Sequence, residues 1–123
     1  MNTPQENFQI SLSSLDNILN GREPEHFLEK ELNDHESKVF DLISNYLPGK
    51  YVGSEFKVAD ISFSGILSGK FRINYNATEY IGCTFTETSM DDYIVVYFEI
   101  DRDNLLVYLT GEQIRERDTF EEF

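Results

Sequence analysis

The chain has 123 residues and a formal charge of −13, from 23 Asp and Glu residues against 10 Lys and Arg residues. This length supports one compact domain and leaves little room for a second hydrophobic core, which disfavours a multidomain enzyme. The negative charge also disfavours direct binding to nucleic acid, because the phosphate backbone would be repelled rather than neutralised.

The first 49 residues carry helical patterns. Ser13 or Ser14 can cap a short helix that contains Leu15 and Ile18. A longer helix is predicted from Pro24, because apolar residues recur at steps of three and four and trace one stripe: Leu28, Leu32, His35, Val39, Ile43 and Tyr46. Most acidic residues lie off this stripe, so we expect the helix to pack on a core and expose a solvated acidic face.

From residue 50 onward the apolar period changes to two, which is typical of β-strands. We expect strands at 57–63, 70–75, 79–88, 93–100 and 105–109, with 93–100 central because both of its faces carry apolar side chains. Turns are predicted at 76–78 and 90–92, and a hairpin loop at 101–104. Residues 112–123 are interpreted as either a short helix or a tail.

These elements predict an α+β fold in a single domain, 1–123. The connections between strands are short and contain no helix, which favours an antiparallel meander of about four to five strands. We expect a helical part at 12–49, a β-sheet at 50–111 on which the helices pack, and an acidic C-terminal segment at 112–123.

The side chains that commonly support catalysis or metal binding are few. His26 and His35 are nine residues apart on one predicted helix, half a turn from alignment, so they cannot share a metal ion. We interpret His35 as a core or boundary residue and Cys83 as a small buried one. No glycine-rich nucleotide motif or nucleophile elbow is found. We therefore expect no enzymatic activity, no cofactor and no metal site.

The cellular setting follows from cysteine content and hydropathy. A single cysteine excludes an internal disulfide, which favours the reducing cytoplasm. The first residues lack a signal-peptide pattern, and no segment is apolar for long enough to predict a membrane span. We expect a cytoplasmic protein with no membrane association.

Acidic residues are found throughout the chain, but some stretches combine them with aromatic side chains. Such a composition is typical of a surface that attracts a Lys- and Arg-rich partner and then buries aromatic anchors. The alternative is that the acidity serves solubility alone. The candidate partner-binding residues are Glu87, Asp91, Asp92, Tyr93, Asp101 and Asp103, with Glu121, Glu122 and Phe123 as a rival site.

In its size, acidity, single-domain character and lack of a catalytic motif, the whole chain resembles the acidic immunity proteins of bacterial toxin–immunity pairs. At the same general level it resembles phage-encoded inhibitors of nucleic-acid-binding defence enzymes. The resemblance implies an inhibitor that binds and occludes the basic active site of a partner toxin or nuclease. It assigns no role to an individual residue.

A second interpretation belongs to another class of protein. A sheet curved over a long helix can enclose a pocket lined by Phe and Tyr. The chain would then be a non-enzymatic regulatory or adaptor module that binds a small apolar ligand, or a partner protein, between helix and sheet. The sequence leaves the oligomeric state open.

Overall fold

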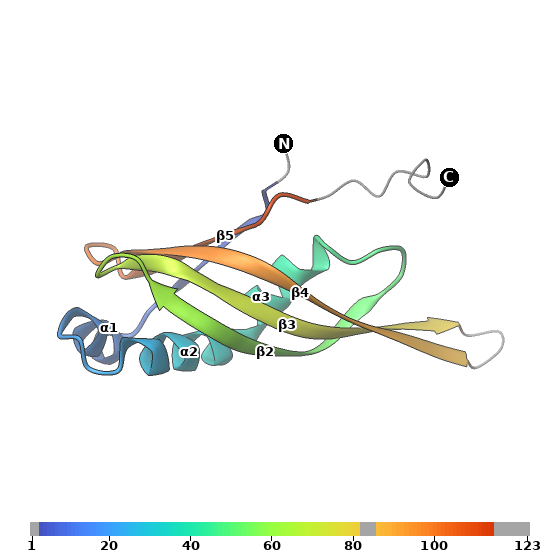
Figure 1. The fold of residues 1–123 in the computed structure, drawn as a ribbon, viewed down its shortest axis with the longest axis horizontal. Helices are drawn as coiled ribbons and strands as arrows, with labels where there is room; N and C mark the ends of the chain where they lie inside the picture. The colour runs from blue at the N-terminus through green and yellow to red at the C-terminus, as the bar shows by residue number, and fades with distance from the viewer. Residues whose placement is uncertain (1–2, 82–85, 115–123) are drawn as a thin grey trace.

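The computed structural model describes residues 3–81 and 86–114. Within these residues, three helices pack on one face of a five-stranded antiparallel sheet, which confirms the predicted α+β fold (Figure 1). The spatial order of the strands is β1-β5-β4-β3-β2, so β2 to β5 form a meander and β1 lies at the edge beside β5. The elements are β1 (Gln5–Gln9), α1 (Leu12–Leu19), α2 (Pro24–Asp34), α3 (Glu36–Ser44), β2 (Val52–Phe63), β3 (Ser68–Ile81), β4 (Thr86–Asp101) and β5 (Leu106–Gly111).

The edge strand β1 was not expected from the sequence. It pairs antiparallel with β5 from Gln5 opposite Thr110 to Gln9 opposite Leu106. Of its five residues, Phe8 alone is buried. A short edge strand with one solvated face needs few apolar residues, so its polar composition concealed it.

The predicted long helix is two helices. His35, between α2 and α3, has φ −118° and ψ 45°, which is outside the helical region. Its ring stacks on Phe8 at a centroid distance of 4.4 Å, and its Nδ1 lies 2.8 Å from the backbone oxygen of Glu31. The apolar stripe concealed this break because α2 and α3 both face the sheet. The cap of α1 also differs from the prediction, because the Ser11 side chain accepts a hydrogen bond from the backbone N–H of Ser14.

The predicted turns at 76–78 and 90–92 are wrong, because both segments lie within the long β3–β4 hairpin. Asn76 pairs with Asp91 in this hairpin, and the Asn76 amide donates to the Asp91 carboxylate at 2.8 Å. The polar residues that suggested turns lie on a strand with one solvated side. Cys83 lies outside the described residues, whereas the predicted loop at 101–104 is confirmed between β4 and β5.

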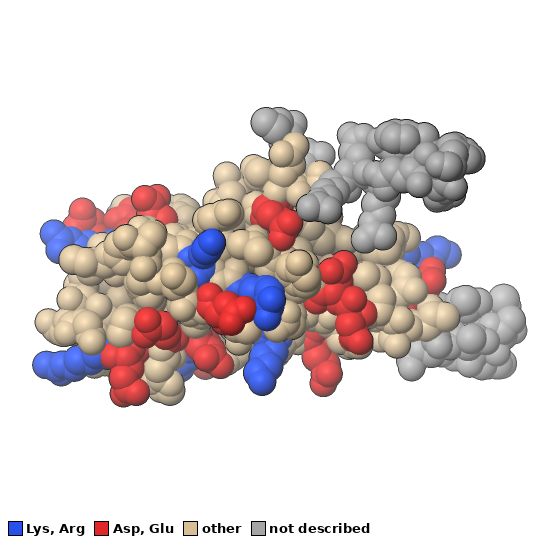
Figure 2. Space-filling view, viewed as in Figure 1, with Lys and Arg blue, Asp and Glu red and all other residues tan. Residues whose placement is uncertain are grey.

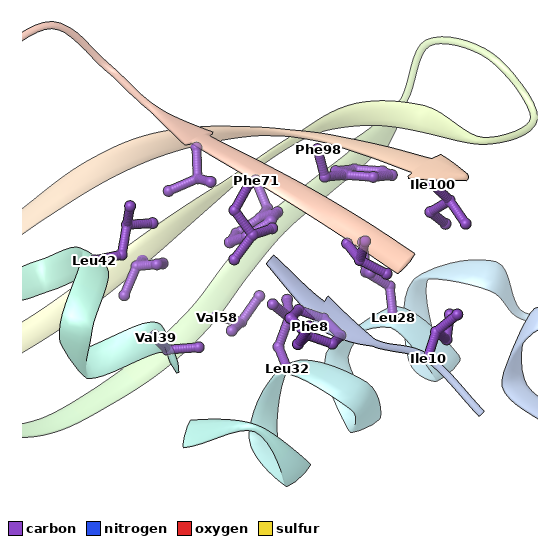
Figure 3. Packing of buried hydrophobic residues seen from close by; sticks show 14 of the residues in the cluster. Phe8, Ile10, Leu28, Leu32, Val39, Leu42, Val58, Phe71, Phe98 and Ile100 are labelled. Atoms are coloured by element: carbon purple, nitrogen blue, oxygen red, sulfur yellow. The ribbon is translucent and has the colours of Figure 1, made fainter. Parts of the chain in front are cut away.

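The hydrophobic core fills the space between the helices and the inner face of the sheet (Figure 3). The central strand is β4, as predicted, and its Val96 is fully buried. The other core residues that are at most 1% exposed are Leu28, Leu32, Val39, Leu42, Ile43, Phe71, Ile73, Ala77, Val107 and Leu109. Among the described helices, none has the length and apolar character needed to cross a membrane.

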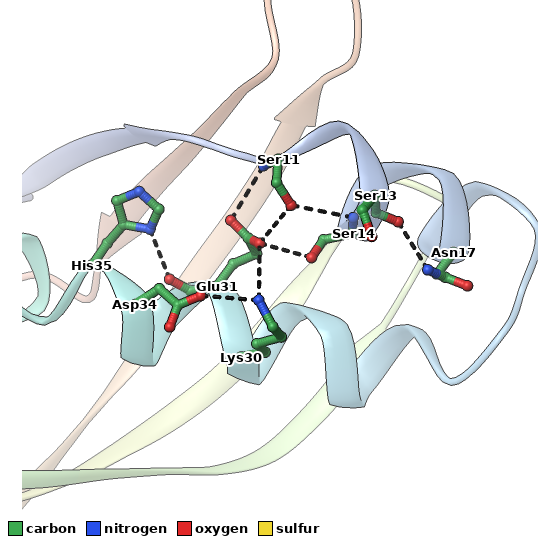
Figure 4. Close-up of polar contacts among 8 residues, drawn as sticks. All are labelled: Ser11, Ser13, Ser14, Asn17, Lys30, Glu31, Asp34 and His35. Carbon is green, nitrogen blue, oxygen red and sulfur yellow. Dashed lines mark hydrogen bonds and ion pairs between the residues drawn. The ribbon is translucent and has the colours of Figure 1, made fainter.

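One carboxylate is buried where α1 and α2 meet (Figure 4). Glu31 is 2% exposed and accepts hydrogen bonds from the hydroxyls of Ser11 at 2.8 Å and Ser14 at 2.7 Å. The backbone N–H of Ser11 also donates to it at 3.3 Å. A buried charge with this many donors is compensated, so the cluster links the start of α1 to α2.

Candidate functional site: the open face and edge of the sheet

One face of the sheet is not covered by any helix in the described part of the chain. Side chains alternate along each strand, and those that point away from the helices include Tyr93 and Tyr97 of β4 and Tyr108 of β5. These tyrosines, which we call the tyrosine face, are 54%, 52% and 41% exposed. Large exposed aromatic side chains on one solvated sheet face mark a candidate interaction surface.

An arginine holds Tyr93 in place. The guanidinium carbon of Arg72 lies 5.4 Å from the centre of the Tyr93 ring, within cation–π range. The Nη2 of Arg72 also lies 3.0 Å from the carboxylate of Asp60. Asp60 has φ 55° and lies at a bulge in β2, where an extra residue turns its carboxylate toward this face. Arg72 and Tyr93 are thereby ordered before any partner binds.

The predicted acidic stretch at 87–103 is not one patch. Asp91 is exposed near Tyr93, whereas Asp101 and Asp103 lie at the other end of β4. Ten residues of extended chain separate Asp91 from Asp101, which is about 33 Å. The sequence grouped these residues because it placed the acidic ones at hairpin ends, where they could reach outward. On the face seen in Figure 2, acidic and basic side chains are interspersed, with basic ones in the middle and at both ends.

The carboxylate of Asp101 organises the β4–β5 loop. The side-chain amide of Asn104 donates to it at 2.8 Å, and the backbone N–H groups of Asp103 and Asn104 donate at 3.1 and 3.2 Å. The bond from the Asn104 side chain, followed by that from its backbone, lowers the pKa of Asp101. Asp103 is exposed in the same loop. The side chain of Glu87 and the whole of the rival site Glu121, Glu122 and Phe123 lie outside the described residues.

A cavity of about 240 Å³ lies beside β4 at the point where β5 ends. Its lining combines tyrosine rings with carboxylates, and we call it the edge cavity. Its lining residues are Tyr46, Tyr75, Asp92, Tyr93, Ile94, Glu112, Gln113 and Ile114.

The carboxylates of the edge cavity bind backbone donors of β4. The N–H of Tyr93 donates to Asp92 Oδ1 at 2.8 Å, and the N–H of Val95 donates to Glu112 Oε1 at 2.6 Å. Charged side chains at a strand edge discourage uncontrolled pairing with other chains. Asp92, predicted from the sequence as an outward charge in a turn, instead contacts the edge of the central strand.

Tyr46 was not recognised as a site residue, because its spacing marked it only as part of the helical stripe. Its hydroxyl donates to the backbone oxygen of Glu112 at 2.6 Å, across 66 residues of sequence. Gly111 permits this approach, since a Cβ at that position would overlap the Tyr46 hydroxyl. Burial, followed by the negative charge of Glu112, raises the pKa of Tyr46 to about 12.

The raised pKa of Tyr46 predicts that the folded chain loses stability at alkaline pH. Because its pKa is about 12 in the folded chain and ordinarily 10.0, the unfolded chain loses this proton first as the pH rises. The stabilising contribution is therefore complete below about pH 10 and is lost toward pH 12. Urea unfolding across this range should show stability falling less steeply in Tyr46→Phe than in the wild type. Tyr108→Phe is the matched control, and an equal slope in Tyr46→Phe and wild type would contradict the assignment.

The fold and this surface define a small α+β domain with an open, tyrosine-bearing sheet face and an acidic strand edge. The chain matches no protein-family model, and no curated protein shows significant sequence similarity to it. Within residues 3–81 and 86–114, no three His, Cys, Asp or Glu side chains come together in a way that could hold a metal ion.

Proposed function

We propose that the protein is a small acidic inhibitor of the immunity type, which binds a basic partner protein and occludes its active site. The partner we envisage is a toxin or another nuclease, whose phosphate-binding cleft is positively charged. The observation that carries the proposal is the tyrosine face, exposed on an uncovered sheet in a protein of charge −13. The proposal includes a cytoplasmic location, where the single cysteine stays reduced.

The chemistry of the open face supports binding to a protein. Tyr and Arg are enriched among the residues that dominate binding energy at interfaces, and Tyr buries a large area at a small entropic cost. Arg72 and Tyr93 are already held together, which reduces the cost of ordering them on binding. The overall negative charge would accelerate the approach of a basic partner.

The alternative, a small apolar ligand between helix and sheet, is less well supported. That interface is filled by core side chains that are at most 5% exposed, from the sheet and from all three described helices. A ligand there would have to displace packed residues such as Leu32 and Phe71. Displacing close-packed side chains costs several kcal/mol, typically about 2–5 per large residue. The open face requires no such rearrangement.

Site-specific photocrosslinking tests the proposal. A photoreactive amino acid replacing Tyr97 on the open face should capture a basic, nucleic-acid-cleaving protein in cell extract from the source organism. The same residue replacing Glu25, which is exposed on α2, should not capture it. The purified partner should lose its nuclease activity when the chain is added, and association should slow as salt rises. A captured partner that is acidic, or whose activity is unaffected, would contradict an inhibitory role.

A further inference from the structure

We infer that the edge of β4 beside the edge cavity, with which no strand of the described residues pairs, is a strand-addition site for an extended, cationic segment of the partner. The inference rests on the proposed function for the basic nature of that partner, and it specifies how the partner would be held. Strand addition gives affinity through backbone hydrogen bonds and specificity through pockets for alternate side chains.

The length difference between two strands creates this edge. β4 runs from Thr86 to Asp101, whereas β5 runs from Leu106 to Gly111. Their pairing ends at Val96 opposite Gly111, with one further bond from the Glu112 N–H to the Val95 oxygen. Within the described residues, no strand pairs with residues 86–94 of β4 on this side.

The direction of the backbone groups follows from the register. In an antiparallel ladder, alternate residues direct both N–H and C=O toward the same neighbour. Val95 directs both groups toward the β5 side, where they meet Glu112. Tyr93 and Asp91, two and four residues earlier on the same strand, therefore direct theirs to the same side. An incoming strand would find donors and acceptors at the normal spacing.

Asp92 allows the Tyr93 N–H to change its hydrogen-bond acceptor when a strand binds. Its carboxylate accepts the Tyr93 N–H, which a carbonyl oxygen of an incoming strand can also accept. On binding, that carbonyl takes the N–H, and the Asp92 oxygen that had accepted it can accept a charge-assisted hydrogen bond from a Lys or Arg side chain of the same strand. The count of hydrogen bonds at Tyr93 is unchanged. A neutral or acidic strand would break the hydrogen bond between the Tyr93 N–H and Asp92 without offering a Lys or Arg side chain to the carboxylate.

The carboxylates of Asp91, Asp92 and Glu112 favour a cationic partner over a second copy of this chain at this edge. Two copies paired along this edge would bring Asp91, Asp92 and Glu112 of each chain near those of the other. Like charges opposite one another destabilise strand pairing. An Arg or Lys side chain, in contrast, would enter a cavity that Asp92, Glu112 and Tyr93 help to line. Carboxylates and aromatic faces both attract a guanidinium group.

Peptide titration followed by NMR tests the inference with the full chain. The probe is a ten-residue peptide of alternating Thr and Arg, and the comparison peptide is the same sequence N-methylated on its six central residues. The unmodified peptide should shift the amide signals of Asp91 and Tyr93 and slow their hydrogen exchange. N-methylation should weaken binding at least about tenfold, because it removes the backbone donors. Equal binding of both peptides would overturn strand addition.

Matched charge variants separate a local effect from net charge. Asp92→Asn with Glu112→Gln should weaken peptide binding at least about tenfold. Glu25→Gln with Asp41→Asn removes the same charge from exposed helix positions and should weaken it less than about threefold. The Asp92→Asn single variant, checked for folding by near-ultraviolet circular dichroism, is the second test if the double variant unfolds. Equal losses in the edge and helix variants would overturn the site.

The outcomes distinguish this inference from the function on which it rests. If crosslinking at position 97 captures a basic nuclease but the peptide leaves the Asp91 and Tyr93 amides unchanged at millimolar concentration, the edge site is wrong and the inhibitor function stands. If the peptide binds as expected but the captured partner is not an inhibited nuclease, the inhibitor function is wrong and the edge site stands as a strand-addition site for cationic segments.

Discussion

Replacing Phe71 with alanine is expected to lower the free energy of unfolding by about 3–5 kcal/mol. Phe71 lies on the inner face of β3, is 1% exposed, and its ring centre is 6.1 Å from that of Phe98. Removing the ring would lose its burial and leave a cavity between sheet and helices, which close-packed neighbours fill only in part. Chemical denaturation monitored by circular dichroism measures the change.

Tyr97→Ala is the control for this prediction, because it removes a similar aromatic ring from the opposite face of the adjacent strand β4. Tyr97 is 52% exposed, so its loss should change stability by less than about 1 kcal/mol. The same variant should weaken binding of the purified partner. Similar destabilisation by the two variants would mean that the tyrosine face is covered in the folded protein, and that the assignment of inner and outer faces is wrong.

Replacing Glu31 with alanine is expected to cost about 3 kcal/mol, although the residue is charged and lies on a helix. The change would remove a carboxylate that is 2% exposed and leave the hydroxyls of Ser11 and Ser14 without their acceptor. The buried Ser14 hydroxyl would be costly without a partner, and hydrogen bonds to a charged group are stronger than neutral ones. Thermal and urea unfolding should both report the loss.

Glu29→Ala is the matched control on α2, because Glu29 is exposed and should change stability by less than about 0.5 kcal/mol. Glu31→Gln keeps the shape and part of the acceptor capacity, so its effect should fall between those of the two alanine variants. If Glu31→Ala were as stable as Glu29→Ala, the hydrogen-bonded cluster that joins α1 to α2 would contribute nothing measurable.

Local patterns in the sequence were sufficient to predict the helix and sheet layers of the fold. The stripe through Leu28, Leu32 and Val39 identified the helix surface that faces the core, and the period of two identified the sheet region. Both signals are local, because burial of one face repeats every 3.6 residues in a helix and every two in a strand. The loop at 101–104 could also be predicted locally, because the Asp101 carboxylate accepts hydrogen bonds from the backbone N–H groups two and three positions later. The strand predicted at 79–88 was wrong as one element, because 79–81 continues β3 and 86–88 begins β4.

The candidate site was only partly predictable. The sequence pointed to Asp91, Asp92 and Tyr93, but it placed the two aspartates in a turn and grouped all three residues with Asp101 and Asp103. It missed Tyr46 and Glu112, whose contact spans 66 residues and has no local signature. The proximity of such residues is set by strand register and by the crossing of helix and sheet, neither of which a periodic pattern encodes.

By itself, the sequence determined the α+β class, the central position of 93–100 and the strongly acidic character, because composition and periodicity fix which faces must be buried. The tertiary structure alone decided that the polar start becomes β1, that 90–92 lies within a strand, and that Tyr46, Asp92 and Glu112 line one cavity. The physical reason is that hydrogen bonding to a neighbouring strand can outweigh the turn preference of polar residues. Whether a neighbouring strand is present depends on the path of the whole chain.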